Sequence, residues 1–202
     1  MNARPSEGPR KPFFAVGFLS RCGVHILRQI KKWAVMSTTS TDLRFTSGQY
    51  REVLGRFTTG VAIITCPGGD GGATGVTVNS FSALSLDPPM VLWCLDNKTG
   101  RGESFNTCNV FAVNVLARAQ QALSVRFSET GQHDFTGIKY DLGQNGAPVL
   151  PGALAVLECD IEARHEGGDH TIVVGRVTGL SSREGEPLLF YRGHYRGIGP
   201  HR

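Results

Sequence analysis

Several features are scarce in this sequence of 202 residues, and each absence narrows its class. No apolar run approaches the length of a transmembrane helix, so we expect no membrane partner. Charged residues make up only 19% of the chain, whereas glycine, with 26 residues, is abundant. This balance favours a β-rich domain with many turns over a helical bundle. The length suits one domain of ordinary size with some additional sequence.

Cysteines are few and lack the spacing of a structural site. They stand at Cys22, Cys66, Cys94, Cys108 and Cys159, an odd number with no C-x-x-C pair. We therefore expect neither a disulfide framework nor a metal site. Cys66, Cys94 and Cys159 lie in apolar, strand-like runs and are interpreted as small buried hydrophobic residues. A reducing cytoplasm fits this pattern.

Nucleotide-binding motifs of the common kinds are also missing. The glycine cluster at 69–74 lacks the last glycine of G-x-G-x-x-G and precedes a strand instead of a helix, so it offers no helix-terminus phosphate site. No P-loop is present. The sequence shows no Cys/His or Ser/His/Asp constellation for nucleophilic catalysis. Any nicotinamide cofactor must therefore bind without a Rossmann domain.

The charge is unevenly distributed along the chain. Residues 1–35 hold seven basic residues and one acidic residue, whereas the remainder has a small net negative charge. The body therefore lacks the electrostatic footprint of a nucleic-acid-binding protein. Three interpretations of residues 1–35 stay open: a surface-seeking amphipathic helix around 26–34, a transit-like peptide, or an upstream extension with Met36 as the true initiator. We place the domain at 36–202 and expect the extension to be disordered.

Hydrophobic periodicity predicts short strands with a few helices between them. A helix capped by Ser47 is expected to continue to about residue 57, and further helices are expected at 102–108 and 119–127. Residues 133–146 are interpreted as a flexible excursion, such as a lid or dimer contact. The strand at 90–95 is almost free of polar residues and is expected to be buried on both faces. Strands are predicted at 61–66, 75–78, 90–95, 110–116, 153–163 and 171–177, with hairpins joining the first two and the last two.

The most informative stretch is Gly75–Pro89, with the sequence GVTVNSFSALSLDPP. A β-branched run is followed by several hydroxyl groups around apolar residues, and the stretch ends at two prolines. A strand end that presents hydroxyls and backbone amides suits a flat, phosphorylated, hydrogen-bonding ligand. The alternative is that these serines and threonines bond to the local backbone, as they commonly do in turns.

This stretch resembles the signature of the flavin reductase family, through the pattern G-x-T-x-N-S-F-x-x-x-S-L-x-P-P. These proteins are the small components of two-component flavin-dependent monooxygenases. The resemblance extends over about residues 44–199. Further matches are F-x-V-N-V-L at 111–116, S-x-R-F-S at 124–128, G-D-H at 168–170 with V-G-x-V after it, and P-L-x-F-Y-R-G-x-Y at 187–195.

The resemblance implies a mainly β fold, an antiparallel Greek-key split β-barrel with peripheral α-helices. It implies a homodimer with the flavin, FMN or FAD, near the subunit interface. The implied activity is that of an NAD(P)H:flavin oxidoreductase, in which hydride passes from NADH or NADPH to flavin and the reduced flavin serves a separate monooxygenase. Two alternatives stay open: a flavin- or haem-binding protein without turnover, and a single-component flavin or deazaflavin oxidoreductase.

The resemblance also assigns site residues. His170 is expected to shape the nicotinamide pocket as the catalytic residue, although the G-D-H triplet is also a common turn sequence. Lys98, Thr99 and Arg101 correspond to a phosphate-binding loop, where Arg101 departs from the family by replacing a hydroxyl. Asn114 interrupts an apolar run, and pairing with backbone is its alternative role. The full set expected to bind the cofactor is Thr77, Val78, Asn79, Ser80, Ser82, Ser85, Lys98, Thr99, Arg101, Asn114, Arg126, Phe127, Ser128, Asp169 and Tyr195.

Overall fold

The computed structural model describes residues 44–69, 71–98, 102–129 and 134–199. The predicted extension, residues 1–35, lies outside the described residues. The fold described below belongs to the compact unit Ser47–Arg202. Its helices are α2 (Ser47–Leu54), α3 (Gly102–Thr107) and α4 (Gln121–Ser128), with a 3-10 turn η1 (Arg118–Gln120) before α4. Its strands are β1 (Thr59–Gly60), β2 (Ala62–Pro67), β3 (Ala73–Val78), β4 (Ser82–Leu86), β5 (Pro89–Asp96), β6 (Val110–Val115), β7 (Asp141–Leu142), β8 (Pro148–Val149), β9 (Ala155–Gly167), β10 (His170–Ser182), β11 (Leu189–Tyr191) and β12 (His194–Arg196).

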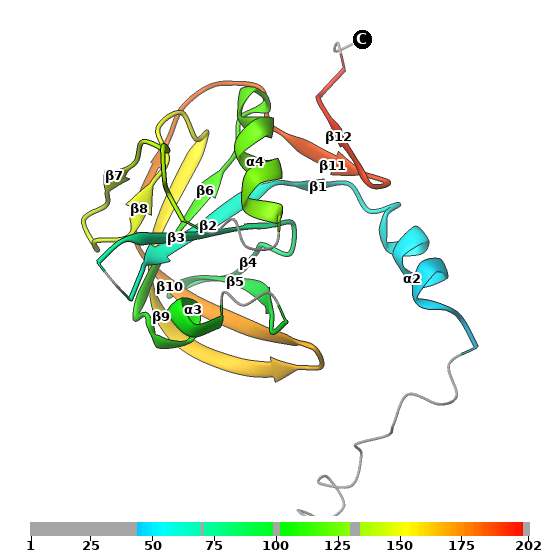
Figure 1. The fold of residues 1–202 in the computed structure, drawn as a ribbon, viewed down its shortest axis with the longest axis horizontal. Helices are drawn as coiled ribbons and strands as arrows, with labels where there is room; N and C mark the ends of the chain where they lie inside the picture. Colours follow the sequence, from blue (N-terminus) through cyan, green and yellow to red (C-terminus); the bar gives the residue numbers. More distant parts are fainter. Residues whose placement is uncertain (1–43, 70, 99–101, 130–133, 200–202) are drawn as a thin grey trace, which may run out of the picture. The chain divides into compact units, whose positions relative to one another are not determined.

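The main sheet is antiparallel and has the strand order β3-β2-β6-β9-β10-β5-β4 (Figure 1). β3 and β4 follow one another in the chain but form opposite edges of this sheet. The sheet curls, because side chains from both of its ends share one core. That core joins Val76 and Val78 of β3 with Val91, Trp93 and Leu95 of β5. The barrel is thus split between β3 and β4.

Aromatic side chains fill the barrel interior. The indole of Trp93 packs edge-on against Phe105, with ring centroids 5.3 Å apart, and against Phe111 at 6.0 Å. All three side chains are fully buried. Phe105 belongs to α3, so this helix closes one end of the barrel. Burying each such ring stabilises the fold by about 2–3 kcal/mol relative to leaving it exposed.

A second core lies outside the barrel, beneath α4 (Figure 1). Phe127 of α4 packs on Phe135 with ring centroids 5.0 Å apart, and Phe135 packs on Tyr140 at 4.9 Å. Only glycine fits at position 75, because a Cβ there would lie 2.8 Å from the Phe127 ring. The part of the predicted excursion that the structure describes, 134–146, is therefore anchored by aromatic packing and includes β7. This differs from the flexible excursion that we expected.

The long β9–β10 hairpin confirms the predicted strand pair and turns at Gly168-Asp169. Gly168 has a φ of +72° at the first central position, as a type II′ turn requires. The register shifts twice along the hairpin, between Val174 and Gly175 and between Val177 and Gly179. Such bulges bend and twist strands. They also interrupt the alternation of buried and exposed residues along the strand predicted at 153–163.

The small sheet β1-β11-β12 and α2 lie at one side of the barrel. α2 ends at Leu54, one turn earlier than predicted, because Gly55 begins a tighter turn through Arg56. A hydrogen bond from the Arg192 N–H to the Gly55 carbonyl, 3.0 Å long, ties this turn to β11–β12. The prediction for 90–95 was also wrong in part: Val91, Trp93 and Leu95 are buried, but Leu92 and Cys94 on the opposite face are only half-buried.

Candidate functional site

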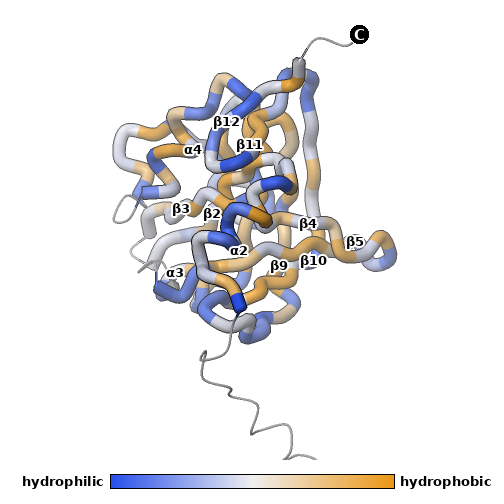
Figure 2. The backbone as a smooth tube through the Cα atoms, turned by 90° about the vertical axis from the view of Figure 1, so that its right-hand side faces the viewer, coloured by the Kyte–Doolittle hydropathy of each residue, from blue (hydrophilic) through white to orange (hydrophobic). Residues whose placement is uncertain are grey.

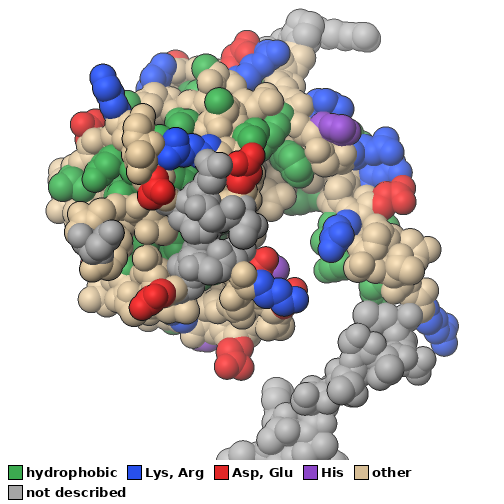
Figure 3. All heavy atoms as spheres, viewed as in Figure 1, with side chains coloured by type: hydrophobic (Ala, Val, Ile, Leu, Met, Phe, Trp, Pro, Cys, Tyr) green, Lys and Arg blue, Asp and Glu red, His purple; other side chains and the backbone are tan. Residues whose placement is uncertain are grey.

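A cleft of about 800 Å³ opens beside the split in the barrel. The segment 79–81 crosses from the β3 edge to the β4 edge along this cleft. The space-filling view shows the same region as a hollow between α2 and the body of the barrel (Figure 3). Its lining residues come from the end of α2 and the turn after it, from β1 and the start of β2, from 79–82 and from the end of β6. They are Leu54, Phe57, Thr58, Thr59, Gly60, Val61, Ala62, Asn79, Ser80, Phe81, Ser82 and Val115.

Three of the predicted ligand residues, Asn79, Ser80 and Ser82, line this cleft together. Asn79 and Ser82 are exposed, and Ser80 is half-buried. The Ser80 hydroxyl accepts a hydrogen bond from the backbone N–H of Cys94 at 3.0 Å, which fixes the crossing segment to β5. Ser85, half-buried in β4, is not among the lining residues. The hydroxyl-rich stretch is thus divided by the fold, and its first half faces the cleft.

Thr59 is a candidate that the sequence analysis missed. Its hydroxyl is buried at the cleft wall and has no hydrogen-bond partner among the described residues. A buried hydroxyl without a partner is unfavourable by about 1–3 kcal/mol, and a ligand that bonds to it removes this penalty. The only sequence signal was a pair of threonines before a glycine, which we took as the end of a helix.

The β3 edge can contribute backbone groups to the candidate site more readily than side chains. β3 pairs with β2 on one side, and within the described part of the chain its other side meets only an isolated bridge from Thr74 to Asp134. An edge strand leaves alternate backbone amides unpaired. The side chain of Val78 points into the core and is 7% exposed. The Thr77 hydroxyl donates to the Ser124 carbonyl at 2.8 Å and so attaches β3 to α4.

The G-D-H turn and the predicted phosphate loop meet at the end of β5. His170 pairs with Asp96 across the β10–β5 ladder, and the Asn97 N–H donates to the Asp169 carbonyl at 3.1 Å. His170 Nδ1 lies 2.7 Å from an Asp169 carboxylate oxygen. This hydrogen bond and the charge of His170 lower the pKa of the Asp169 carboxyl, and Lys98 adds a smaller effect. Thr99 and Arg101 lie outside the described residues.

His170 is not a lining residue of the 800 Å³ cleft. It is connected to that cleft through β5, because Cys94 holds Ser80 and Asp96 pairs with His170 on the same strand. The imidazole is 42% exposed, so it is available to a ligand. In Figures 1 and 2 the tip of the β9–β10 hairpin and α2 lie on the same side of the molecule.

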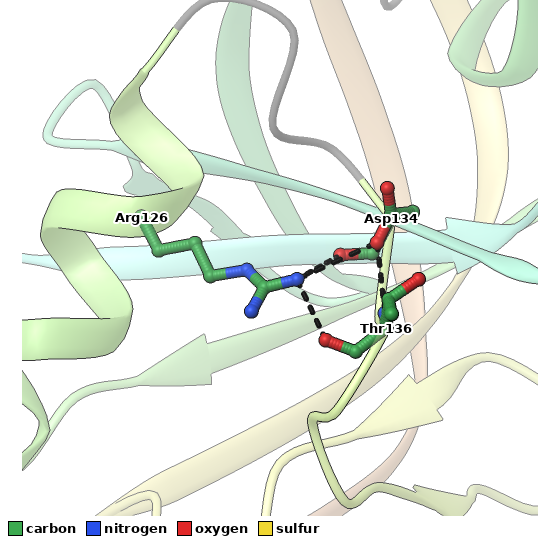
Figure 4. A network of polar contacts seen from close by, with 3 residues as sticks. All are labelled: Arg126, Asp134 and Thr136. Atoms are coloured by element: carbon green, nitrogen blue, oxygen red, sulfur yellow. Dashed lines mark hydrogen bonds and ion pairs between the residues drawn. The ribbon is translucent and has the colours of Figure 1, made fainter.

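The predicted binding residues at 124–128, in α4, mainly stabilise the fold. Arg126 Nη2 donates to the Thr136 carbonyl at 2.8 Å and lies 3.4 Å from the Asp134 carboxylate, which fastens the segment after the helix (Figure 4). Phe127 is fully buried and packs in the core beneath α4, so its side chain serves the fold, and its contact with a cofactor stays a prediction. The Ser128 hydroxyl donates to the Val125 carbonyl at 2.7 Å.

Tyr195 also stabilises the packing around α4. Its hydroxyl lies 2.8 Å from the Ser124 hydroxyl, and its ring packs edge-on against Phe190 at 5.4 Å. Tyr195 is half-buried and joins β12 to α4. Because the Tyr195 hydroxyl already bonds to Ser124, this geometry does not support the predicted contact between Tyr195 and the cofactor.

Asn114 requires a correction. The side chain is fully buried, and its Nδ2 donates to the Ile63 carbonyl and to the Thr65 hydroxyl, both at 3.1 Å. Its Oδ1 accepts a hydrogen bond from the Leu150 N–H at 2.8 Å. Because its amide is satisfied and its side chain is fully buried, the described fold leaves Asn114 no free polar group for a cofactor. The backbone pairing considered as its alternative role is what the fold uses.

The comparisons with known proteins identify the family of the chain. Residues 54–199 match the flavin reductase like domain. The chain belongs to the flavin reductase family. It is 45% identical over 153 residues to the reductase subunit HsaB of a flavin-dependent monooxygenase from Rhodococcus jostii, covering 75% of this chain and 78% of the relative. It is 42% identical over 149 residues to the FMN reductase (NADH) SmoA of Agrobacterium fabrum, covering 74% and 84%.

A solved structure shows the same fold in this flavin reductase family. The NADH:FAD oxidoreductase SgcE6 of Streptomyces globisporus, in complex with NAD and FAD fragments, superposes with a TM-score of 0.73 at 35% identity, covering 79% of this chain and 98% of that one. The predicted family, split-barrel fold and NAD(P)H-dependent flavin reductase activity are therefore confirmed.

In this flavin reductase a second cleft, of about 880 Å³, lies between the β2–β3 turn, α3 and residues 134–140. Glu103 lines it, and the negative charge disfavours a phosphate. The cleft beside the split is therefore the better flavin site. Among the described residues no three His, Cys, Asp or Glu side chains are placed to hold a metal ion, and no described helix is long and apolar enough to cross a membrane.

Proposed function

We propose that the cleft beside the split holds the flavin ring of FMN or FAD. The observation that carries this assignment is the buried Thr59 hydroxyl, which has no partner in the part of the chain that the structure describes and lines the same cleft as Asn79 and Ser82. Asn79 and Ser82 supply exposed polar groups for the ribityl chain or the ring edge. As an edge strand that leads into the cleft segment 79–82, β3 is suited to offer backbone amides to the charge that grows on the ring as it is reduced.

The cleft also fits a flat ring in size and in chemistry. Its volume of about 800 Å³ is within the range of ordinary ligand pockets. Phe57, Phe81 and Val115 supply apolar walls against which a ring can stack. Lys98, which is exposed, lies beyond the end of β5 and offers a positive charge to a phosphate.

We place the nicotinamide on the side of His170 and name NADH as the donor, in line with the NADH-dependent relatives. When bound, nicotinamide supplies a hydride from C4 to flavin N5, chemistry that belongs to the two cofactors. His170 acts here by orienting the ring, and the Asp169 carboxylate holds the imidazole through the 2.7 Å contact at Nδ1. No side chain of the site needs to act as a nucleophile.

Reduced flavin is proposed to pass to a separate monooxygenase component. The support is the chain's similarity to a reductase subunit of a flavin-dependent monooxygenase. We place the protein in the cytoplasm, because the described cysteines Cys66, Cys94, Cys108 and Cys159 are all free thiols.

We further propose that a second copy of the chain covers the rim of the cleft, as a homodimer. Val53 and Leu54 at the end of α2 and Phe57 in the turn after it are apolar, yet they are 70%, 53% and 77% exposed. Leu84 and Leu86 of β4 are 48% and 93% exposed, on a hairpin that projects from the body (Figure 2). Exposed apolar groups on this scale mark an interaction surface. Sedimentation of the full chain and of Val53→Asp tests this: the variant is expected to be monomeric, and a monomeric wild type would contradict the proposal.

The experiment for the flavin site compares Thr59→Val with Thr107→Val. FMN and FAD are titrated by fluorescence quenching, and NADH oxidation is followed by absorbance. Wild type is expected to bind with a Kd on the order of micromolar. Thr59→Val is expected to weaken binding about 5- to 30-fold, the loss of one hydrogen bond. Thr107, whose hydroxyl donates to the Glu103 carbonyl in α3, is the control. Equal flavin binding by both variants would show that Thr59 does not belong to the flavin site.

A further inference from the structure

Two cysteines that are far apart in the sequence meet at the edge of the barrel core. Cys66 lies near the end of β2 and is fully buried, and Cys108 follows α3 and is half-buried. The Cys108 side chain packs against the core cluster that contains Cys66. The Cys108 thiol donates to the Phe105 carbonyl at 3.6 Å, and it also lies close enough to the Cys66 thiol for each to shift the pKa of the other. The two sulfurs are therefore neighbours, and one of them is accessible from solvent.

Arg164 of β9 holds a positive charge beside this pair. Its Nη2 donates to the Cys108 carbonyl at 2.6 Å and to the Phe105 carbonyl at 2.9 Å, which fixes the guanidinium against the end of α3. The hydrogen bond from Cys66, followed by the charge of Arg164, holds the pKa of the Cys108 thiol below its ordinary value. The same hydrogen bond and burial raise the pKa of Cys66.

The buried thiol of Cys159 provides a contrast to Cys108. Burial raises the pKa of Cys159 to about 12, and the neighbouring carboxylates of Asp160 and Glu158 add to this shift. Cys159 is fully buried and faces the barrel core, so it is chemically inert. Cys108 differs in all three respects: it is partly exposed, it lies beside a cation, and it has a second thiol within contact.

We propose that Cys108 and Cys66 form a peroxide-reactive pair that closes to a disulfide between α3 and β2. Cys108 is the attacking residue, because it is partly exposed and lies beside the Arg164 guanidinium, whereas Cys66 is fully buried. Cys66 is the resolving sulfur. The oxidant is hydrogen peroxide, which forms where reduced flavin meets dioxygen by transfer of two electrons and two protons.

The chemistry balances in two steps. In the first step the Cys108 thiolate attacks one peroxide oxygen, the O–O bond breaks, and hydroxide leaves, giving the sulfenic acid. In the second step the Cys66 sulfur attacks the Cys108 sulfur, the S–O bond breaks, and the hydroxyl group leaves with the Cys66 proton as water. Together the two thiols lose two electrons, and peroxide is reduced to water. α3 follows the segment 98–101 directly, so the disulfide would fasten the helix beside the predicted phosphate loop.

The test treats the reduced full chain with hydrogen peroxide, removes the excess, blocks remaining thiols with iodoacetamide and analyses the digest by mass spectrometry. We expect a peptide pair linked through Cys66 and Cys108, which dithiothreitol separates. Cys108 is expected to react roughly tenfold or more faster than Cys159, following its greater thiolate fraction. Cys108→Ser is expected to abolish the link, and the matched variant Cys159→Ser is expected to keep it.

A second variant keeps the proposal testable if a serine disturbs the fold. In Cys66→Ala the resolving sulfur is absent, so dimedone is expected to trap a sulfenic acid at Cys108. The proposal is overturned if Cys108 is not labelled in this variant. It is also overturned if wild-type Cys108 oxidises no faster than Cys159 or yields a linkage with a different cysteine.

Discussion

The Ser80 hydroxyl accepts a hydrogen bond from the backbone N–H of Cys94 at 3.0 Å, and this contact joins the segment that crosses the split to the central part of β5. Ser80 is thus both a wall of the cleft and a structural tie. Ser80→Ala leaves the Cys94 N–H without this partner, so we expect the free energy of unfolding to fall by about 1–2 kcal/mol and flavin binding to weaken.

The matched control for Ser80 is Ser82→Ala. Ser82 lines the same cleft but is exposed, and among the described residues its hydroxyl bonds to the neighbouring Ala83 carbonyl. We expect this variant to change the free energy of unfolding by less than about 0.5 kcal/mol while still weakening flavin binding. Urea denaturation and flavin titration separate the two effects. Equal stability of both variants would show that the Cys94 contact does not support the fold.

His170→Ala is expected to impair hydride transfer more than flavin binding. The imidazole is partly exposed, and among the described residues its side-chain polar contact is with Asp169, so the fold should tolerate its removal. Loss of ring orientation is expected to lower kcat/KM for NADH on the order of 10- to 100-fold. Steady-state kinetics and a flavin titration on the same sample check this. Reduced flavin affinity with unchanged NADH kinetics would place His170 on the other side of the flavin.

The Asp169 carboxyl should titrate below its ordinary range, because the hydrogen bond and charge of His170 lower its pKa. A carboxyl with a lowered folded-state pKa contributes stability above its unfolded pKa, and that contribution is lost as the pH falls through the lowered value. Carbon-detected NMR of the side-chain carboxyl measures the midpoint. In His170→Ala the midpoint is expected to rise toward the ordinary value. Lys98→Ala, which removes a smaller effect, is expected to raise it less.

A comparison of two asparagine variants distinguishes a residue that stabilises the fold from a residue that belongs to the binding site. Asn114→Ala removes the partner of the Ile63 carbonyl, the Thr65 hydroxyl and the Leu150 N–H, all in the interior. We expect it to lower the free energy of unfolding by about 2–3 kcal/mol and to leave the flavin Kd of the folded fraction unchanged. Asn79→Ala, at an exposed cleft position, is expected to do the reverse. Thermal unfolding and flavin titration are measured for both variants. If Asn114→Ala weakened flavin binding without lowering the stability of the fold, the assignment of Asn114 to the fold would be wrong.

Removal of residues 1–35 is expected to leave folding and activity intact. The family match begins at residue 54, and the compact unit begins at Ser47. A chain that starts at Met36 is therefore expected to reduce flavin at the full-length rate and to unfold within a few degrees of the full-length Tm. A large loss of either property would mean that the extension belongs to the folded domain.

The sequence alone determined the strand pattern and the family. Alternating β-branched residues at 75–78 and 110–116 predict strands because side chains in a strand alternate between its faces, and turn residues such as Gly168 punctuate them. The motif at 75–89 identified the stretch that borders the cleft. Such features are local in the chain, so they can be recognised without knowing which strands pair.

Only the tertiary structure decided which polar groups remain available. Thr77, Asn114 and Tyr195 look like Asn79 and Ser82 in the sequence, but their polar atoms bond to segments that lie far along the chain. Thr59 was overlooked because a missing partner becomes visible only when every neighbour is placed. The Cys66–Cys108 pair is of the same kind, since α3 brings one thiol to the other across the barrel edge. Whether a donor or a thiol is used by the fold or left for chemistry depends on long-range packing, which spacing in the sequence does not encode.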